Sequence, residues 1–167
     1  YGVRGMVTHR LLIIAHAPSP NTLAMRAAVE AGAQREDIND VAVLVKSPLE
    51  AGPDDVLNTH GVILGTTENL GYMSGALKDF FDRSYYPLLE RTQGLPYSLY
   101  IRAGLDGTGT RRSVESITTG LKWRAIQEPL LCHGEYNKRF LDDCRDFGTL
   151  MAAGLEAGIF EKTHRVR

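Results

Sequence analysis

The chain alternates between short apolar runs and longer segments whose apolar residues recur at helical spacing. Five runs have the length and composition of buried strands: residues 11–15, 40–45, 62–64, 95–103 and 129–133. Most of them are separated by segments with apolar residues three or four positions apart, which is typical of amphipathic helices. This order predicts an α/β fold, a three-layer α/β/α sandwich in which helices cover both faces of a five-stranded parallel sheet.

The stretch 61–83 is the most informative part of the sequence. Its apolar run predicts a strand that stops at Gly65, and residues 66–71 then form a loop of hydroxyl, amide and glycine residues. Such a loop at the carboxyl end of a strand can approach a planar ligand closely and offer it many neutral hydrogen bonds. Ser74 is a suitable N-cap for the helix that follows. The apolar face of that helix comprises Leu77, Phe80, Phe81 and Ser84.

Two further polar loops follow strands. After the first strand, Ser19 is the predicted N-cap and Pro20 the first residue of a helix. The free N–H groups and the dipole at this helix N-terminus favour an anion such as phosphate. After the fourth strand, residues 104–109 form a glycine-rich loop before a helix predicted at 111–123. With a strand order of 2-1-3-4-5, all three loops converge on one edge of the sheet.

The segment 63–83 resembles the second cofactor loop of the flavodoxin-like superfamily. It is most similar to the NAD(P)H-dependent FMN reductases and quinone reductases of that superfamily. Thr67 and Glu68 stand where the family usually has a proline, often followed by an acidic residue. The residues that carry the resemblance are Ile63-Leu64-Gly65-Thr66, Gly71, Met73-Ser74-Gly75, Leu77-Lys78, Phe80 and Asp82-Arg83.

The loop after the first strand is similar in spacing to the phosphate loop of the flavodoxins. Ser19, Asn21 and Thr22 keep polar groups that suit a phosphate. Ala17 lacks the usual hydroxyl, and Pro20 replaces a glycine and has no N–H to donate. The loop therefore offers two fewer hydrogen-bond donors than the family pattern.

The resemblance implies FMN as cofactor and NAD(P)H as electron donor for the reduction of FMN, a quinone or a similar small acceptor. It places the FMN phosphate at residues 16–22 and the flavin ring between residues 66–74 and 102–109. Since hydride transfer to flavin N5 is the cofactor's own chemistry, no catalytic side chain is expected. The resemblance also implies a homodimer or tetramer. The expected cofactor-binding residues are His16, Ser19, Asn21, Thr22, Thr66, Thr67, Glu68, Asn69, Leu70, Gly71, Tyr72, Met73, Ser74, Arg102, Ala103, Gly104, Asp106 and Gly107.

Two alternatives with the same fold stay open. One is a flavodoxin-type electron carrier, although such carriers are typically strongly acidic and this chain has a formal net charge of −1. The other is a flavin-less binding or assembly module, which the depleted phosphate loop at Ala17 and Pro20 would suit. A dinucleotide fingerprint is disfavoured because Arg112 occupies the position of its last glycine.

Two other classes of protein fit less well. A response receiver needs an acidic cluster after the first strand and an aspartate at the end of the third, where this chain has Ala15-His16 and Gly65-Thr66. A serine hydrolase needs the pattern G-x-S-x-G, whereas Ser74 stands in G-Y-M-S-G.

The bulk properties bound these expectations. The 167 residues suit a single domain at 6–160, with 1–5 as an expression remnant or disordered N-terminus and 161–167 as a polar tail. Nineteen basic and 20 acidic residues indicate neither a nucleic-acid footprint nor a membrane-attracting patch. No apolar run approaches the roughly 18 residues of a membrane span. Cys132 and Cys144 suggest buried thiols, no metal site and a cytoplasmic location.

Overall fold

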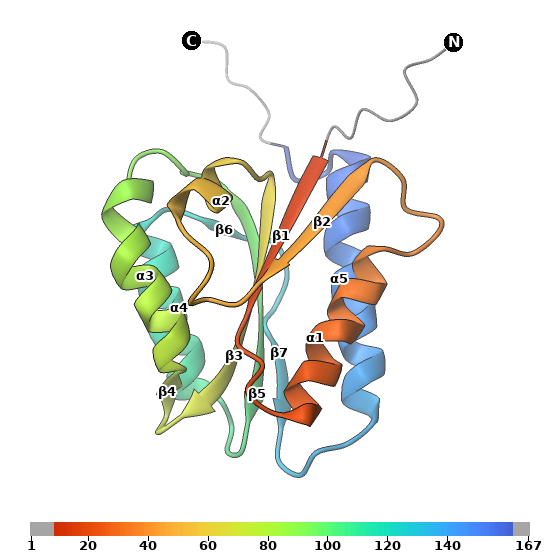
Figure 1. Ribbon diagram of the computed structural model, residues 1–167, viewed down its shortest axis with the longest axis vertical. Helices are drawn as coiled ribbons and strands as arrows, with labels where there is room; N and C mark the ends of the chain where they lie inside the picture. Colours follow the sequence, from red (N-terminus) through yellow and green to blue (C-terminus); the bar gives the residue numbers. More distant parts are fainter. Residues whose placement is uncertain (1–8, 162–167) are drawn as a thin grey trace.

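A twisted sheet separates two layers of helices in the computed structural model, which describes residues 9–161 (Figure 1). The expectations for residues 1–5 and 162–167 concern parts of the chain outside the described residues. The strands are β1 (His9–Ala15), β2 (Val41–Lys46), β3 (Gly61–Asn69), β4 (Tyr72–Met73), β5 (Pro96–Ala103), β6 (Arg124–Ala125) and β7 (Leu130–His133). The helices are α1 (Pro20–Ala33), α2 (Pro53–Leu57), α3 (Gly75–Leu88), α4 (Thr108–Gly120) and α5 (Arg139–Ala157).

The sheet has the predicted order. Strands β2, β1, β3 and β5 lie side by side in parallel, and both β6 and β7 pair with β5 on its other side. The five strands predicted from the apolar runs correspond to β1, β2, β3, β5 and β7, so the order 2-1-3-4-5 is confirmed. The edge next to β5 is divided, since β6 pairs with Pro96 and Tyr97 and β7 pairs with residues 100–103. Pro129, which has no N–H to donate to a ladder, directly precedes β7. Strands β4 and β6, with two residues each, are additions that the apolar pattern did not indicate.

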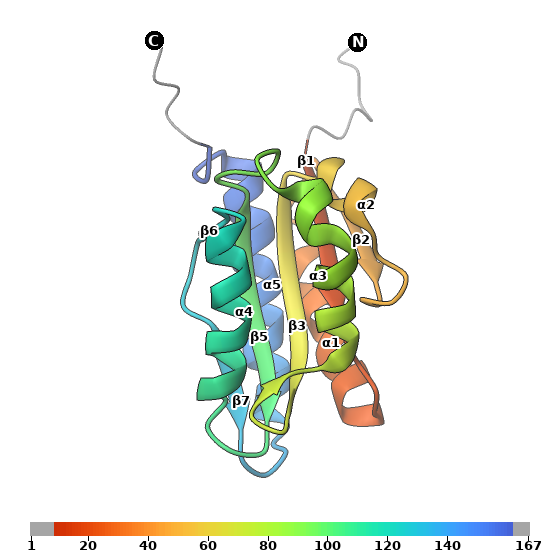
Figure 2. The same cartoon turned by 90° about the vertical axis from the view of Figure 1, so that its left-hand side faces the viewer.

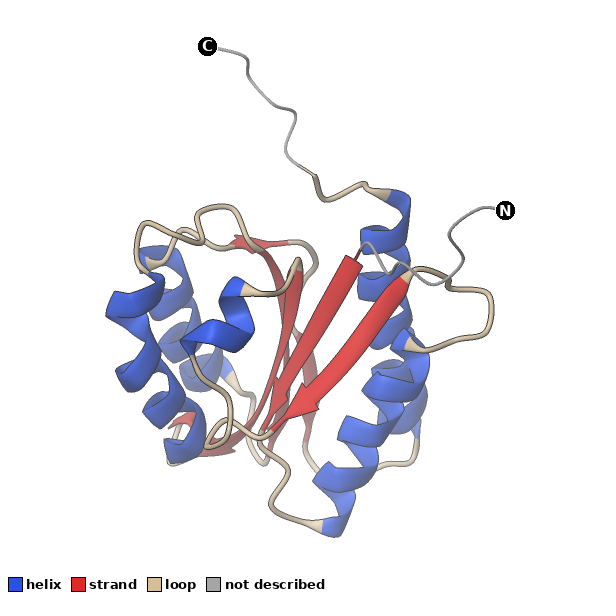
Figure 3. Cartoon of the chain, turned by 45° about the horizontal axis from the view of Figure 1, so that its top comes forward, coloured by secondary structure: helices blue, strands red, loops and turns tan. Residues whose placement is uncertain are grey.

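The core is divided between the two faces of the sheet. Leu12 and Ile14 of β1 belong to the cluster under α2, α3 and α4, whereas Leu11 and Ile13 belong to the cluster under α1 and α5. This alternation follows from the two-residue period of a strand, and both faces are apolar because both are covered. Figure 2 shows α3 and α4 in front of β3 and β5, and Figure 3 shows the sheet between its helical layers. Within the described chain, no helix is both long and apolar enough to cross a bilayer.

The segment after Gly65 differs from the prediction. Strand β3 continues to Asn69, because Thr66 and Thr67 pair with residues of β5 instead of leaving the sheet. The chain then turns back, and β4 pairs antiparallel with the end of β3. The polar loop predicted at 66–71 is therefore wrong in form, and these residues belong to a β-hairpin. Helix α4 also begins three residues earlier than predicted, since Gly107 in a left-handed conformation ends the preceding loop.

Candidate functional site

Three loops meet at the carboxyl edge of the sheet, at the bottom of Figure 1. They follow β1, β3 and β5, which are neighbours, so the topology alone brings them together. The N–H of His16 donates to the carbonyl of Gly65 at 3.0 Å and joins the first loop to β3. Burial lowers the pKa of His16, so the imidazole is neutral at physiological pH. This edge of the sheet is the candidate site.

A reciprocal cap closes the first loop against helix α1. Ser19 Oγ accepts from the N–H of Thr22 at 3.2 Å, and Thr22 Oγ1 accepts from the N–H of Ser19 at 2.9 Å. The two hydroxyl oxygens lie 2.8 Å apart, and Thr22 Oγ1 also lies 3.1 Å from the carbonyl oxygen of Ser19. The hydroxyl groups that were expected to face a phosphate are thus part of the helix cap.

Few backbone donors of this loop remain for a ligand. Pro18 and Pro20 have no N–H, and the N–H groups of His16, Ser19 and Thr22 donate within the protein. Within the described chain, this leaves the N–H of Ala17 in the loop and the N–H of Asn21 in the first turn of α1, together with the exposed amide side chain of Asn21. Asn21 is therefore the member of the predicted phosphate set that is most available to an anion.

The β3–β4 hairpin forms the middle of the site. Its turn, Leu70 and Gly71, has φ of 53° and 70°, the pattern of a two-residue type I′ turn. Leucine is an unusual choice at positive φ, and here its side chain is fully exposed. Thr67 Oγ1 donates to Asn69 Oδ1 at 2.9 Å, and this contact is exposed to solvent.

Other hairpin residues have a supporting role. Thr66 Oγ1 accepts from the N–H of Ser74 at 2.9 Å and donates to the carbonyl of Thr67 at 2.8 Å. Ser74 Oγ in turn accepts from the N–H of Leu77 at 3.2 Å, which confirms Ser74 as the N-cap of α3. Thr66, Met73 and Ser74 are all buried. These three residues were expected to bind the cofactor. Their side chains are buried, and the hydrogen bonds of Thr66 and Ser74 hold the hairpin and α3 in place.

The hairpin is fastened to helix α4. Thr110 Oγ1 donates to the carbonyl of Tyr72 at 3.1 Å, and the N–H of Met73 donates to Ser113 Oγ at 3.1 Å. A Cβ at Gly109 would lie 2.1 Å from the carbonyl oxygen of Gly71, so only glycine allows this approach. Sequence reasoning missed Thr110 and Ser113, because their partners in the hairpin lie 38 and 40 residues away and no local pattern indicates such contacts.

The third loop is held by two carboxylates. Glu68 Oε1 accepts from the N–H of Leu105 at 3.0 Å, and Glu68 Oε2 accepts from the N–H of Gly107 at 2.9 Å. Asp106 Oδ1 accepts from the N–H of Thr108 at 3.0 Å, and this backbone hydrogen bond lowers the pKa of Asp106. Gly104 precedes these contacts and has open space around its α-carbon. Glu68 therefore connects the hairpin directly to the loop.

Arg102 is engaged by the protein at the other side of the third loop. Its Nη1 donates to the carbonyl oxygens of Ala103 at 2.7 Å and Cys132 at 3.1 Å. Its guanidinium carbon lies 5.3 Å from the ring centroid of Phe140 and 5.9 Å from that of Tyr136. Arg102 thus joins the ends of β5 and β7 to the start of α5. Nothing in the sequence indicated the two aromatic partners.

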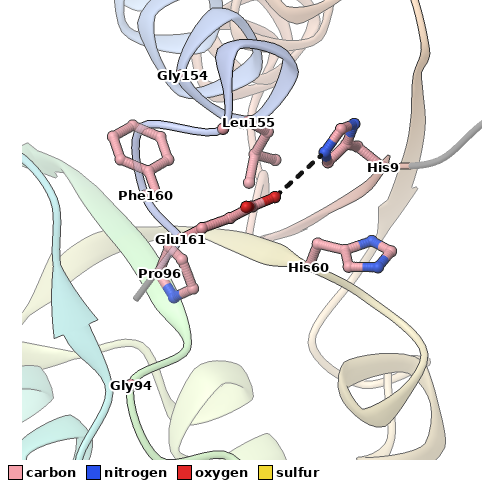
Figure 4. Close-up of a pocket in the computed structure, with 9 residues that line it drawn as sticks. His9, His60, Gly94, Pro96, Gly154, Leu155, Phe160 and Glu161 are labelled. Atoms are coloured by element: carbon pink, nitrogen blue, oxygen red, sulfur yellow. Dashed lines mark ion pairs between the residues drawn. The ribbon is translucent and has the colours of Figure 1, made fainter. Parts of the chain in front are cut away.

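A separate pocket of about 190 Å³ lies at the opposite edge of the sheet (Figure 4). His9 Nε2 lies 4.0 Å from Glu161 Oε1, and His60 Nδ1 accepts from the N–H of Arg10 at 2.9 Å. Leu155 and Phe160 supply apolar walls. No group of three or more His, Cys, Asp or Glu side chains in the described chain could hold a metal ion.

Comparisons with known proteins agree with this architecture. A flavodoxin from the domain Archaea matches 88% of this chain and 99% of its own, with 17% sequence identity and a TM-score of 0.74. Two-electron reduced Megasphaera elsdenii flavodoxin matches 86% of this chain and 98% of its own, with 17% sequence identity and a TM-score of 0.69. A WrbA-like flavodoxin from Agrobacterium tumefaciens matches 90% of this chain and 99% of its own, with 16% sequence identity and a TM-score of 0.68. No protein-family model matches the sequence, and no curated protein matches it significantly.

The chain therefore has the flavodoxin-like fold, as the resemblance of residues 63–83 indicated. At these identities the similarity concerns the fold, and the chemistry has to be argued from this chain's own residues.

Proposed function

We propose that the protein binds FMN at the carboxyl edge of its sheet and uses NAD(P)H to reduce FMN, a quinone or a similar small acceptor. The observation that carries this proposal is the meeting of the loops after β1, β3 and β5 at one edge of a flavodoxin-like sheet. In open parallel α/β sheets, ligands bind in the crevice outside the carboxyl ends of the strands. The chemistry that FMN supplies when bound is hydride acceptance at N5 and electron delivery to an acceptor.

The first loop suits a phosphate, although with fewer donors than the family pattern. The N–H groups of Ala17 and Asn21 and the Asn21 amide remain available in the loop and the first turn of α1. These groups and the helix dipole would hold the phosphate.

The hairpin and the third loop suit a flat ring. Exposed apolar side chains stand on both, with Leu70 and Tyr72 on the hairpin and Leu105 on the loop. An exposed apolar side chain on each of these two segments is available for contact with an apolar ring face. Thr67 and Asn69 add neutral hydrogen-bonding groups beside them. The near-zero net charge of −1 favours a reductase over a strongly acidic electron carrier.

The proposal is tested by visible spectroscopy of the pure protein. FMN is titrated first, and NADPH or NADH is then added without oxygen. A perturbed flavin spectrum that bleaches on addition of nucleotide supports a reductase. A bound flavin that neither nucleotide reduces contradicts the reductase proposal and supports an electron carrier. Light scattering with and without FMN checks the expected dimer or tetramer.

A flavin-less binding module is the second candidate. It is favoured by the closed Ser19–Thr22 cap and by Pro18 and Pro20, which together leave the loop few free donors. Absence of any spectral change at millimolar FMN would support this candidate and contradict the first one.

A further inference from the structure

Glu68 links the hairpin to the third loop beyond the end of the β3–β5 ladder. Thr67 and Arg102 form the last pair of that ladder, and the Glu68 side chain then replaces backbone pairing. Its two carboxylate oxygens accept separately from the N–H groups of Leu105 and Gly107, at 3.0 and 2.9 Å. Hydrogen bonds to an ionised carboxylate are roughly twice as strong as neutral ones. This link is therefore a strong contact between the two loops.

The loop is shaped around this carboxylate. Gly107 has a φ of 72°, and the N–H groups of Leu105 and Gly107 bind one side chain from opposite ends of a three-residue segment. Successive backbone N–H groups arranged in this way form a concave anion site. Here the anion is supplied by the chain itself. Those two donors are consequently not available to a ligand while Glu68 is in place.

The rest of the hairpin is fixed by neutral contacts on its other side. Thr110 and Ser113 of α4 bind the backbone of Tyr72 and Met73. The hairpin is thus attached to α4 independently of Glu68, and removal of the carboxylate would release the third loop without detaching the hairpin. This separation makes the role of Glu68 measurable.

We infer that Glu68 is a positioning residue of the proposed flavin site, and this inference rests on the proposed function. Its carboxylate fixes the third loop against the hairpin, so that the two walls of the ring site are already in place before a ligand arrives. The carboxylate group also stays where the hairpin meets the third loop. If a flavin is bound at this edge, the negative charge of Glu68 would oppose the addition of electrons to it and would lower its midpoint potential.

The test uses the full chain with Glu68→Gln and Glu68→Ala. Glu135→Gln is the control, because Glu135 is an exposed carboxylate after β7, at the same edge of the sheet. The first readout needs no ligand: amide hydrogen exchange at Leu105 and Gly107, followed by NMR. We expect exchange to accelerate by about tenfold or more in both Glu68 variants and to stay unchanged in the control.

The second readout uses FMN. Glu68→Ala is expected to weaken FMN binding about tenfold, and Glu68→Gln to make the midpoint potential more positive, with no change in the control. Melting temperatures identify any variant that fails to fold, and Glu68→Gln keeps the side-chain volume.

Three outcomes overturn the inference. Unchanged exchange at Leu105 and Gly107 means that the link does not hold the loop. Faster exchange with unchanged FMN affinity and potential means that the link does not serve the flavin site. If the Glu68 variants show the exchange effect but the wild-type protein binds no FMN, the proposed function is contradicted, and the positioning role fails with it while the link itself stands.

Discussion

Two buried tyrosines of strand β5 differ in what their hydroxyl groups contact. The hydroxyl of Tyr97 lies 2.9 Å from Thr118 Oγ1, whereas that of Tyr100 has no hydrogen-bond partner among the described residues. Burial raises the pKa of Tyr100, so the hydroxyl stays protonated. We expect Tyr100→Phe to raise the free energy of unfolding by about 1 kcal/mol and Tyr97→Phe to lower it by about 1 kcal/mol. Urea denaturation measures both, and a destabilised Tyr100→Phe would contradict the assignment.

At the scale of elements, the contact between the hairpin and α4 depends on Gly109. An added methyl group would meet the Gly71 carbonyl, which belongs to the backbone and cannot rotate away. Gly109→Ala is expected to lower the free energy of unfolding by about 1–3 kcal/mol. Gly104→Ala is the matched control, since a methyl group there meets nothing within 4 Å. Equal stability of the two variants, measured by thermal denaturation, would show that the hairpin does not rest on α4.

The pairing of β1 with the segment before β3 gives stability a pH dependence. Burial, followed by the charges of Arg10 and His9, lowers the pKa of His60 from 6.5, while Glu161 opposes the shift. As pH falls below 6.5, the unfolded chain binds protons that the folded chain resists, so stability declines toward acid.

Urea midpoints between pH 7 and pH 5 measure this decline. It should be smaller in His60→Gln, whose amide oxygen can still accept from Arg10, and unaltered in His133→Gln, an exposed control. If the stability of the wild-type protein, His60→Gln and His133→Gln declines equally, other titrating groups cause the pH dependence.

The elements also show what the sequence could and could not predict. Apolar runs predicted β1, β3 and β5 in the correct order, because strands buried on both faces must be apolar throughout. The hairpin was missed because Thr67, Glu68 and Asn69 are polar and pair through their backbone. Its turn, Leu70-Gly71, also lacks the usual Asn-Gly signal.

At the scale of the whole molecule, topology could be predicted but long-range polar contacts could not. Glu68 lies 37 and 39 residues from its two partners, and no local pattern encodes such a contact. A different limit applies to Ser19 and Thr22, which lie only three residues apart. Their spacing predicted a helix cap and a phosphate loop equally well, and the structure shows that the cap uses both hydroxyl oxygens.

The central claim, that a flavin phosphate lies at the N-terminus of α1, is tested most directly by comparing FMN with riboflavin. Fluorescence titrations use the wild-type protein, Asn21→Asp and, as a control with the same added charge at the opposite edge, Gln93→Glu. An aspartate at this helix start is compatible with the helix dipole but repels a phosphate.

We predict that Asn21→Asp weakens FMN binding by about tenfold or more while riboflavin binding stays the same, and that Gln93→Glu changes neither. If the protein binds neither flavin, or if Asn21→Asp leaves FMN affinity unchanged, the claim is wrong.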